Sequence, residues 1–175
     1  MTTLDWSPFA VAAPDARPEA PRSIHQLEGI GDRLRAAAFA EIQAREAFRW
    51  AVTRFEDVHP SLRNAWLTLA VAEEKHMNWL LKRMTELELD VQGRKVSDHL
   101  WRSFMHCKSA AEFAIFMANA EERGQRAGQR FYEALLEKDS ITAHIFGKIA
   151  DEETAHIALS RQFFPAEVSA GLPLA

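Results

Sequence analysis

Two Glu-x-x-His segments lie eighty residues apart in this chain, at Glu73–His76 and at Glu153–His156. In a helix, positions i and i+3 lie on one face. Each segment would therefore present a carboxylate oxygen and an imidazole nitrogen to the same point. Two such helices facing each other, with one further Glu from each of two more helices, would form a dinuclear metal site inside a four-helix bundle.

An internal repeat supplies the two further carboxylates. A shift of 80 residues places Glu41 on Glu121 and the first Glu-x-x-His on the second. Glu41 precedes Glu73 by 32 residues, and Glu121 precedes Glu153 by the same interval. In an antiparallel helical hairpin, residues equidistant from the turn lie at the same height. The repeat therefore predicts that each Glu-x-x-His meets one Glu from its partner helix.

A third Glu-x-x-His, Glu56–His59, shows that the motif alone is weak evidence. It lies beside Pro60, and Ile24 stands 32 residues upstream in place of a Glu, so we interpret it as a chance match. The alternative for the repeated pair is solvated faces or hydrogen-bonded core groups. That alternative requires burying four carboxylates without a cation, which is very costly. The predicted metal ligands are Glu41, Glu73, His76, Glu121, Glu153 and His156.

The ligand types indicate the metal. Four carboxylates and two imidazoles suit two iron ions best, with manganese or a mixed iron–manganese pair as alternatives. The lack of thiolate ligands argues against a structural zinc site or an iron–sulfur cluster. We predict that Glu73 and Glu153 bridge the metals and that Glu41 and Glu121 are terminal. Open positions would take dioxygen, peroxide or a substrate.

Three further residues could support this site. A metal-bound His usually donates its second N–H to a carboxylate, and Glu152 is placed to reach His76, with Asp151 as a competing choice and a surface role as the alternative. Gly124 and Gly128 follow Glu121 within a helix, where each costs about 1 kcal/mol relative to Ala. They predict either room for a substrate beside the metals or a close helix–helix approach.

Apolar periodicity predicts an all-α fold of four long helices. Ser23 or Asp32 would cap the first helix, Ser61 the second, and Ser109 the third in a capping box with Glu112. Short turns join the first helix to the second and the third to the fourth, so the chain forms two antiparallel hairpins connected by a long crossover link. The expected long helices span 24–57, 61–88, 109–137 and 141–164, with a short helix at 98–105.

The chain divides into an extended N-terminal arm (1–22), the bundle (23–165) and a loose tail (166–175). Four prolines disfavour helix in the arm. Trp6 and Phe9 lead us to expect it on the bundle surface, and a partly mobile terminus is the alternative.

Composition narrows the function classes. A net charge of −4 and a pI near 6.0 disfavour nucleic acid but leave a tRNA partner open. No apolar run reaches the length of a membrane span. The single cysteine, Cys107, fits a cytoplasmic location, and we expect it to be a packed core residue.

The two halves resemble ferritin-like di-iron carboxylate proteins, and most closely a bacterial ferritin-like family of unassigned function. The segments that carry the likeness are Glu28-Gly29, Glu41–Ala44, Glu73–His76, Glu121–Gly124 and Asp151–His156, ending at Phe163-Phe164. The chain is more distantly similar to tRNA-hydroxylating di-iron enzymes. The resemblance implies the same six ligands and an oxygen-using site. It also implies a His at position 39, where this chain has Phe39.

Three functions follow as hypotheses. The first is an oxygen-dependent di-iron oxidase or oxygenase, which requires an external electron donor and an apolar pocket leading to the metals near Gly124. The second is ferroxidase, peroxide-handling or storage activity. The third is a non-catalytic, metal-stabilised bundle, for which an outer helix face could form a homodimer.

Overall fold

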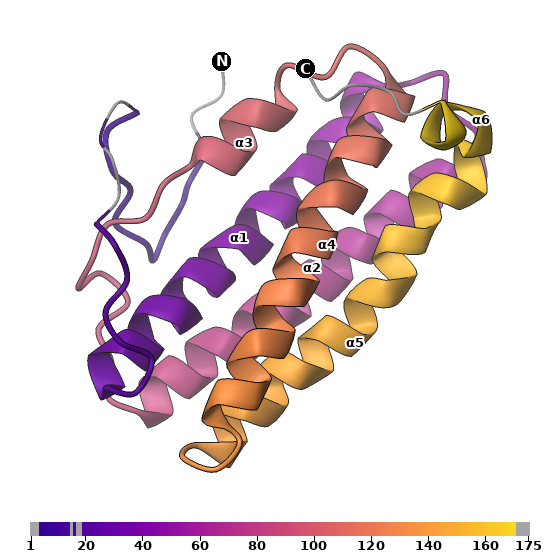
Figure 1. The fold of residues 1–175 in the computed structure, drawn as a ribbon. Coiled ribbons are helices and arrows are strands. Elements are labelled where there is room, and N and C mark those ends of the chain that lie inside the picture. Colours follow the sequence, from indigo (N-terminus) through magenta and orange to yellow (C-terminus); the bar gives the residue numbers. More distant parts are fainter. Residues whose placement is uncertain (1–3, 15, 17–18, 171–175) are drawn as a thin grey trace.

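The computed structural model describes residues 4–14, 16 and 19–170. The predicted all-α class is confirmed, with four long helices by their bounds, and Figure 1 shows the long helices packed side by side as a bundle. Within the described residues, the only β pairing is an isolated bridge between Val11 and Val96. The helices are α1 (Leu27–Arg54), α2 (Pro60–Glu86), α3 (His99–Phe104), α4 (Ala110–Leu135), α5 (Ser140–Phe163) and α6 (Pro165–Ser169).

The long helices pair as two antiparallel hairpins, α1 with α2 and α4 with α5, as the repeat predicted. Helix starts follow local capping chemistry. Ser109 Oγ accepts a hydrogen bond from the Glu112 amide, which confirms the predicted cap of α4. The predicted cap of α2 was wrong: Pro60 opens that helix, and the His59 ring accepts from the Ser61 amide. Pro at the first helical position suits a site whose N–H would lack a partner.

The predicted caps of α1, Ser23 and Asp32, were also wrong. The helix begins after Gln26 without a side-chain cap. Asp32 lies inside the helix instead, where it is buried and accepts hydrogen bonds from Arg22 (2.7 Å) and Arg94 (2.6 Å). Although burial opposes it, these hydrogen bonds hold the pKa of Asp32 well below its usual value. Asp32 therefore fastens the N-terminal arm and the crossover link to α1.

The apolar core has two parts. One surrounds Phe39 near the N-terminal arm, and the other surrounds Trp66 and Phe113 near the opposite end of the bundle. Cys107 is packed in the second part. Burial raises the pKa of its thiol to about 11, which fits the packing role predicted for it.

The N-terminal arm lies on the bundle, as predicted, wherever it is described. Val96 accepts from the Ala12 amide (2.8 Å), so the arm pairs with the crossover link. The rings of Trp6 and Phe9 pack against Phe39 at 5.5 and 5.1 Å between centroids. Phe39, which replaces the His that the resemblance implied, therefore supports the arm. The prediction for residues 1–3, 15 and 17–18 falls outside the described part of the chain.

Two further segments complete the fold. In the crossover link, the Trp101 amide donates to the buried side chain of Gln43 (2.9 Å), which ties the start of α3 to α1. The predicted loose tail includes most of the short helix α6, and residues 171–175 lie outside the described part. Among the described residues, no helix combines the length and apolar character that crossing a membrane requires.

Candidate metal centre

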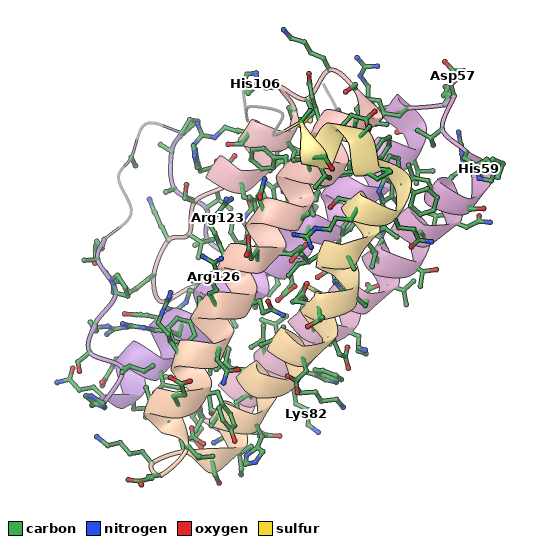
Figure 2. All side chains as sticks on the ribbon, turned by 45° about the vertical axis from the view of Figure 1, so that its right-hand side comes forward. Asp57, His59, Lys82, His106, Arg123 and Arg126 are labelled. Atoms are coloured by element: carbon green, nitrogen blue, oxygen red, sulfur yellow. The ribbon has the colours of Figure 1, made fainter. Side chains whose placement is uncertain are left out.

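The structure brings the predicted ligands together in the middle of the bundle. Glu41 comes from α1, Glu73 and His76 from α2, and Glu153 from α5, and each offers one atom within 4.8 Å of the others. All four are buried. Figure 2 shows the contrast with charged residues such as Lys82 and Arg126, which lie on the outside of the bundle.

Each of two carboxylates turns one oxygen toward each of two imidazoles. Glu73 Oε1 lies 3.0 Å from His156 Nδ1, and its Oε2 lies 3.7 Å from His76 Nδ1. Glu153 Oε1 lies 3.2 Å from His76 Nδ1, and its Oε2 lies 2.9 Å from His156 Nδ1. These contacts define two positions, one beside each His, with Glu73 and Glu153 reaching both. This is the arrangement expected of bridging carboxylates.

The remaining two carboxylates lie beside this core. Glu41 Oε2 is 3.9 Å from His76 Nδ1, on the side of the first position. Glu121 interacts with Glu153 and Glu73, and one of its carboxylate oxygens is buried. Glu121 stands at the position of the repeat that corresponds to Glu41, and among the described residues the group whose atoms lie within 4.8 Å of one another contains Glu41 but not Glu121 or His156.

The buried polar atoms of the cluster do not form hydrogen bonds with one another. They lie close together, yet none has a partner at hydrogen-bonding geometry. Buried polar groups are nearly always hydrogen-bonded, so such a concentration calls for an explanation. Atoms that all aim at common points satisfy metal ions rather than one another. The atoms are Glu73 Oε1 and Oε2, His76 Nδ1, Glu121 Oε1, Glu153 Oε1 and Oε2, and His156 Nδ1.

Burial and mutual contacts shift the pKa values of the metal-free cluster toward protonated forms. Burial, followed by the charge of Glu73, raises the pKa values of Glu41 and Glu121 well above the usual carboxyl value. Against the effect of burial, contacts with Glu153 and Glu73 raise the pKa of His76 to about 9 and that of His156 to about 10. All four pKa shifts favour the protonated forms, so protons offset part of the negative charge of the buried carboxylates. Two divalent metal ions would offset the same four carboxylate charges.

One imidazole is anchored from outside the cluster. Glu152 Oε2 lies 2.8 Å from His76 Nε2, the contact predicted from the sequence. Its competitor Asp151 is exposed. Sequence reasoning missed Lys75, whose ammonium contacts the same Glu152 oxygen at 2.5 Å. Ala72 occupies the equivalent of Glu152 in the first half, so the repeat offers His156 no matching carboxylate.

An apolar cavity of about 320 Å³ reaches the cluster between α1 and α4. Glu41, Glu121 and Glu153 lie at its inner wall. The two glycines differ: a Cβ on Gly124 would meet nothing within 4 Å, whereas a Cβ on Gly128 would lie 3.3 Å from the Phe146 carbonyl oxygen. Gly124 therefore leaves open space beside the carboxylates, and Gly128 allows close packing of α4 on α5.

Comparison with known proteins places the chain in a family without supplying an activity. The model of a family described as "Protein of unknown function (DUF455)" matches residues 8–170. No match was found among curated proteins, and none among solved structures.

Proposed function

The chain belongs to this DUF455 family, whose description states no activity, and we propose from the site itself that it is a ferritin-like dinuclear metal oxidase or oxygenase. Iron is the metal that the donor set favours, with manganese or a mixed pair as alternatives. Dioxygen or peroxide would be the co-substrate.

The proposed ligands fall into two matched sets. His76 and Glu41 would hold one ion, His156 and Glu121 the other, and Glu73 and Glu153 would bridge them. The support is the pattern of contacts, in which each bridging carboxylate turns one oxygen toward each His. Two ferrous ions bound there would supply electrons to dioxygen.

The cavity is the observation that favours an organic substrate over iron handling alone. It is lined mainly by apolar side chains, and three of the carboxylates form part of its wall. A ligand in it would lie against the carboxylates of the cluster and contact mainly apolar side chains. The cavity is also lined by Gly124, where the sequence predicted a pocket. A bulky side chain at this position would block the substrate and leave the metal ligands in place, so it would distinguish substrate access from metal binding.

The remaining residues would position and insulate the centre. Glu152, by accepting a hydrogen bond from the Nε2–H of His76, would fix the tautomer that leaves Nδ1 free to ligate. The chain has a single cysteine and hence no Cys-x-x-Cys pair, so we propose that electrons come from a separate donor protein. Such a donor would bind transiently.

Metal content and oxygen reactivity test the proposal together. We expect wild-type protein, reconstituted anaerobically with Fe(II), to hold two ions per chain by elemental analysis and to change its optical spectrum on exposure to oxygen. Glu73→Gln should lose much of this iron. Glu56→Gln, which alters the unpaired third Glu-x-x-His, is the matched control and should retain both ions.

The outcomes separate the candidate functions. Protein that folds but binds no iron would refute the dinuclear assignment. Rapid oxidation of many Fe(II) ions per chain, unaffected by a bulky residue at Gly124, would instead support the ferroxidase alternative. Tight iron binding without any reaction with oxygen would favour the non-catalytic bundle.

A further inference from the structure

The cavity beside the metal centre is elongated along the bundle. Helices α1 and α4 run antiparallel past each other (Figure 1), and the cavity lies between them. On α1, its lining extends from Asp32 to Ala44, a rise of about 18 Å at 1.5 Å per residue. On α4, it extends from Met117 to Phe131. The cavity is thus a channel that passes the carboxylates rather than a round chamber.

Small residues on both helices set the width of this channel. They are Ala36, Ala37, Ala40 and Ala44 on α1, and Ala120, Gly124, Ala127 and Gly128 on α4. Phe131, Phe146 and Ile149 line it with larger apolar side chains. A volume of about 320 Å³ lies at the small end of ligand pockets, so a long occupant must also be thin. An unbranched hydrocarbon chain has this shape.

The end of the channel near the N-terminal arm is basic. Arg33 lines it and donates to the carbonyl oxygens of Gly29 (3.2 Å) and Arg22. Among the described residues, no carboxylate lies within 4 Å of the Arg33 guanidinium. Asp32 also lines this end, but its carboxylate is already bound to Arg22, Arg35 and Arg94. Three guanidinium groups therefore bind Asp32, and the guanidinium of Arg33 is left to bind an external anion.

Toward its other end the channel passes the buried acids. Glu153 is 3% exposed, and both of its carboxylate oxygens lack hydrogen-bond partners. Arg33 and Glu41 are eight residues apart on one helix, which places them about 12 Å apart along its axis. If the anionic head of a ligand binds Arg33, the head therefore lies away from the metal centre, and a carbon in the middle of its alkyl chain lies beside it.

We propose that the channel binds a linear fatty acid, with its carboxylate on Arg33 and its alkyl chain running along α1 and α4 toward Glu41 and Glu121. The inference deepens the proposed function, because the reaction would then take place on a mid-chain carbon. Binding itself depends only on the channel and on Arg33.

Calorimetric titration with dodecanoate and dodecanol tests the shape and the head group. Wild-type protein should bind dodecanoate in a 1:1 ratio and at least about tenfold more tightly than dodecanol, because a charge-assisted hydrogen bond contributes about that factor. Arg33→Gln should remove this preference and leave the affinity for dodecanol unchanged. The control Lys82→Gln removes a cation from the outside of α2, distant from the channel, and should keep the preference.

Gly124→Leu tests the channel, since a Cβ there meets open space and the rest of the side chain would occupy the channel. It should abolish binding of both ligands, whereas Gln129→Leu, at an exposed position of α4 outside the lining, should not. No binding of dodecanoate by the wild type, equal affinity for both ligands, or full affinity in Gly124→Leu would each overturn the proposal.

Iron content and oxygen uptake, measured on the same samples, distinguish the two proposals. Iron binding and oxygen uptake without dodecanoate binding would refute the fatty-acid channel alone. Dodecanoate binding by protein that takes up no iron would refute the dinuclear function and support the channel.

Discussion

Glu152→Gln is expected to weaken one metal position and spare the other. Glu152 contacts His76 through Nε2, and nothing at the equivalent position Ala72 can do the same for His156. Losing a carboxylate partner of a metal-binding His typically costs 10- to 100-fold in metal affinity. The Glu152 side chain is 31% exposed, so water can partly replace it. We therefore expect about a tenfold loss, or about 1.4 kcal/mol, at the His76 position alone.

Anaerobic titration with Co(II), followed by calorimetry and visible absorption, can resolve the two positions. Lys75→Met is one control, because it removes the other partner of Glu152, an ammonium that is nearly half exposed and contributes little. Asp151→Asn is the second, because it alters the exposed neighbour. Equal weakening of both positions, no weakening of either, or the same loss in Asp151→Asn would refute this reasoning.

Four other substitutions test the fold. Asp32→Asn should lower the free energy of unfolding by about 2 kcal/mol at neutral pH, because the guanidinium groups around it lose their anion. The cost stays moderate because some of these groups are partly exposed to water. Because the pKa of Asp32 is lower in the folded state, its contribution to the free energy of unfolding is complete above the usual carboxyl pKa and is lost as the pH falls toward the folded-state pKa. Urea unfolding of the wild type and Asp32→Asn at several pH values measures this loss. A difference in stability that does not change with pH would contradict the prediction. Phe113→Ala should cost about 3–5 kcal/mol in the same assay, because the side chain is fully buried among aromatic rings; a loss below 1 kcal/mol would mean that this core is not packed as described. Gly124→Ala should raise stability by about 1 kcal/mol through helix propensity. Gly147→Ala should lower stability, because its Cβ would lie 2.9 Å from the Tyr132 ring. Thermal unfolding of both variants measures the two changes, and changes in the same direction would refute the prediction.

Much of the site could be predicted because its spacing is local and repeated. The 32-residue interval encodes the height at which two helices of one hairpin meet, so Glu41 and Glu73 could be brought together without any coordinates. The Glu152–His76 contact followed from the helix faces in the same way. These relations depend only on helical geometry.

Other features depend on long-range packing that no local pattern encodes. Asp32 has the sequence position of a cap, yet tertiary contacts with Arg94 bury it inside the helix. The pairing of the arm with Val96 joins segments that share no periodicity. The channel arises where small residues of α1 and α4 face each other. In the sequence alone, alanines in a helix are equally consistent with a channel and with tight helix packing. Only the placement of the two hairpins shows that the space stays open.

The division of the bundle into two hairpins has a consequence for how the protein folds and opens. Most contacts between helices lie within each hairpin, and those from α1 to α4 or from α2 to α5 are few. Local contacts favour fast formation of each hairpin unit, and both parts of the apolar core hold the two units together. The ion pair of Arg83 with Asp139 (2.8 Å) joins the units at one end, and bound metals would join them at the centre. Amide hydrogen exchange should therefore slow along the line where the hairpins meet when metal is added, while exchange inside each hairpin changes little.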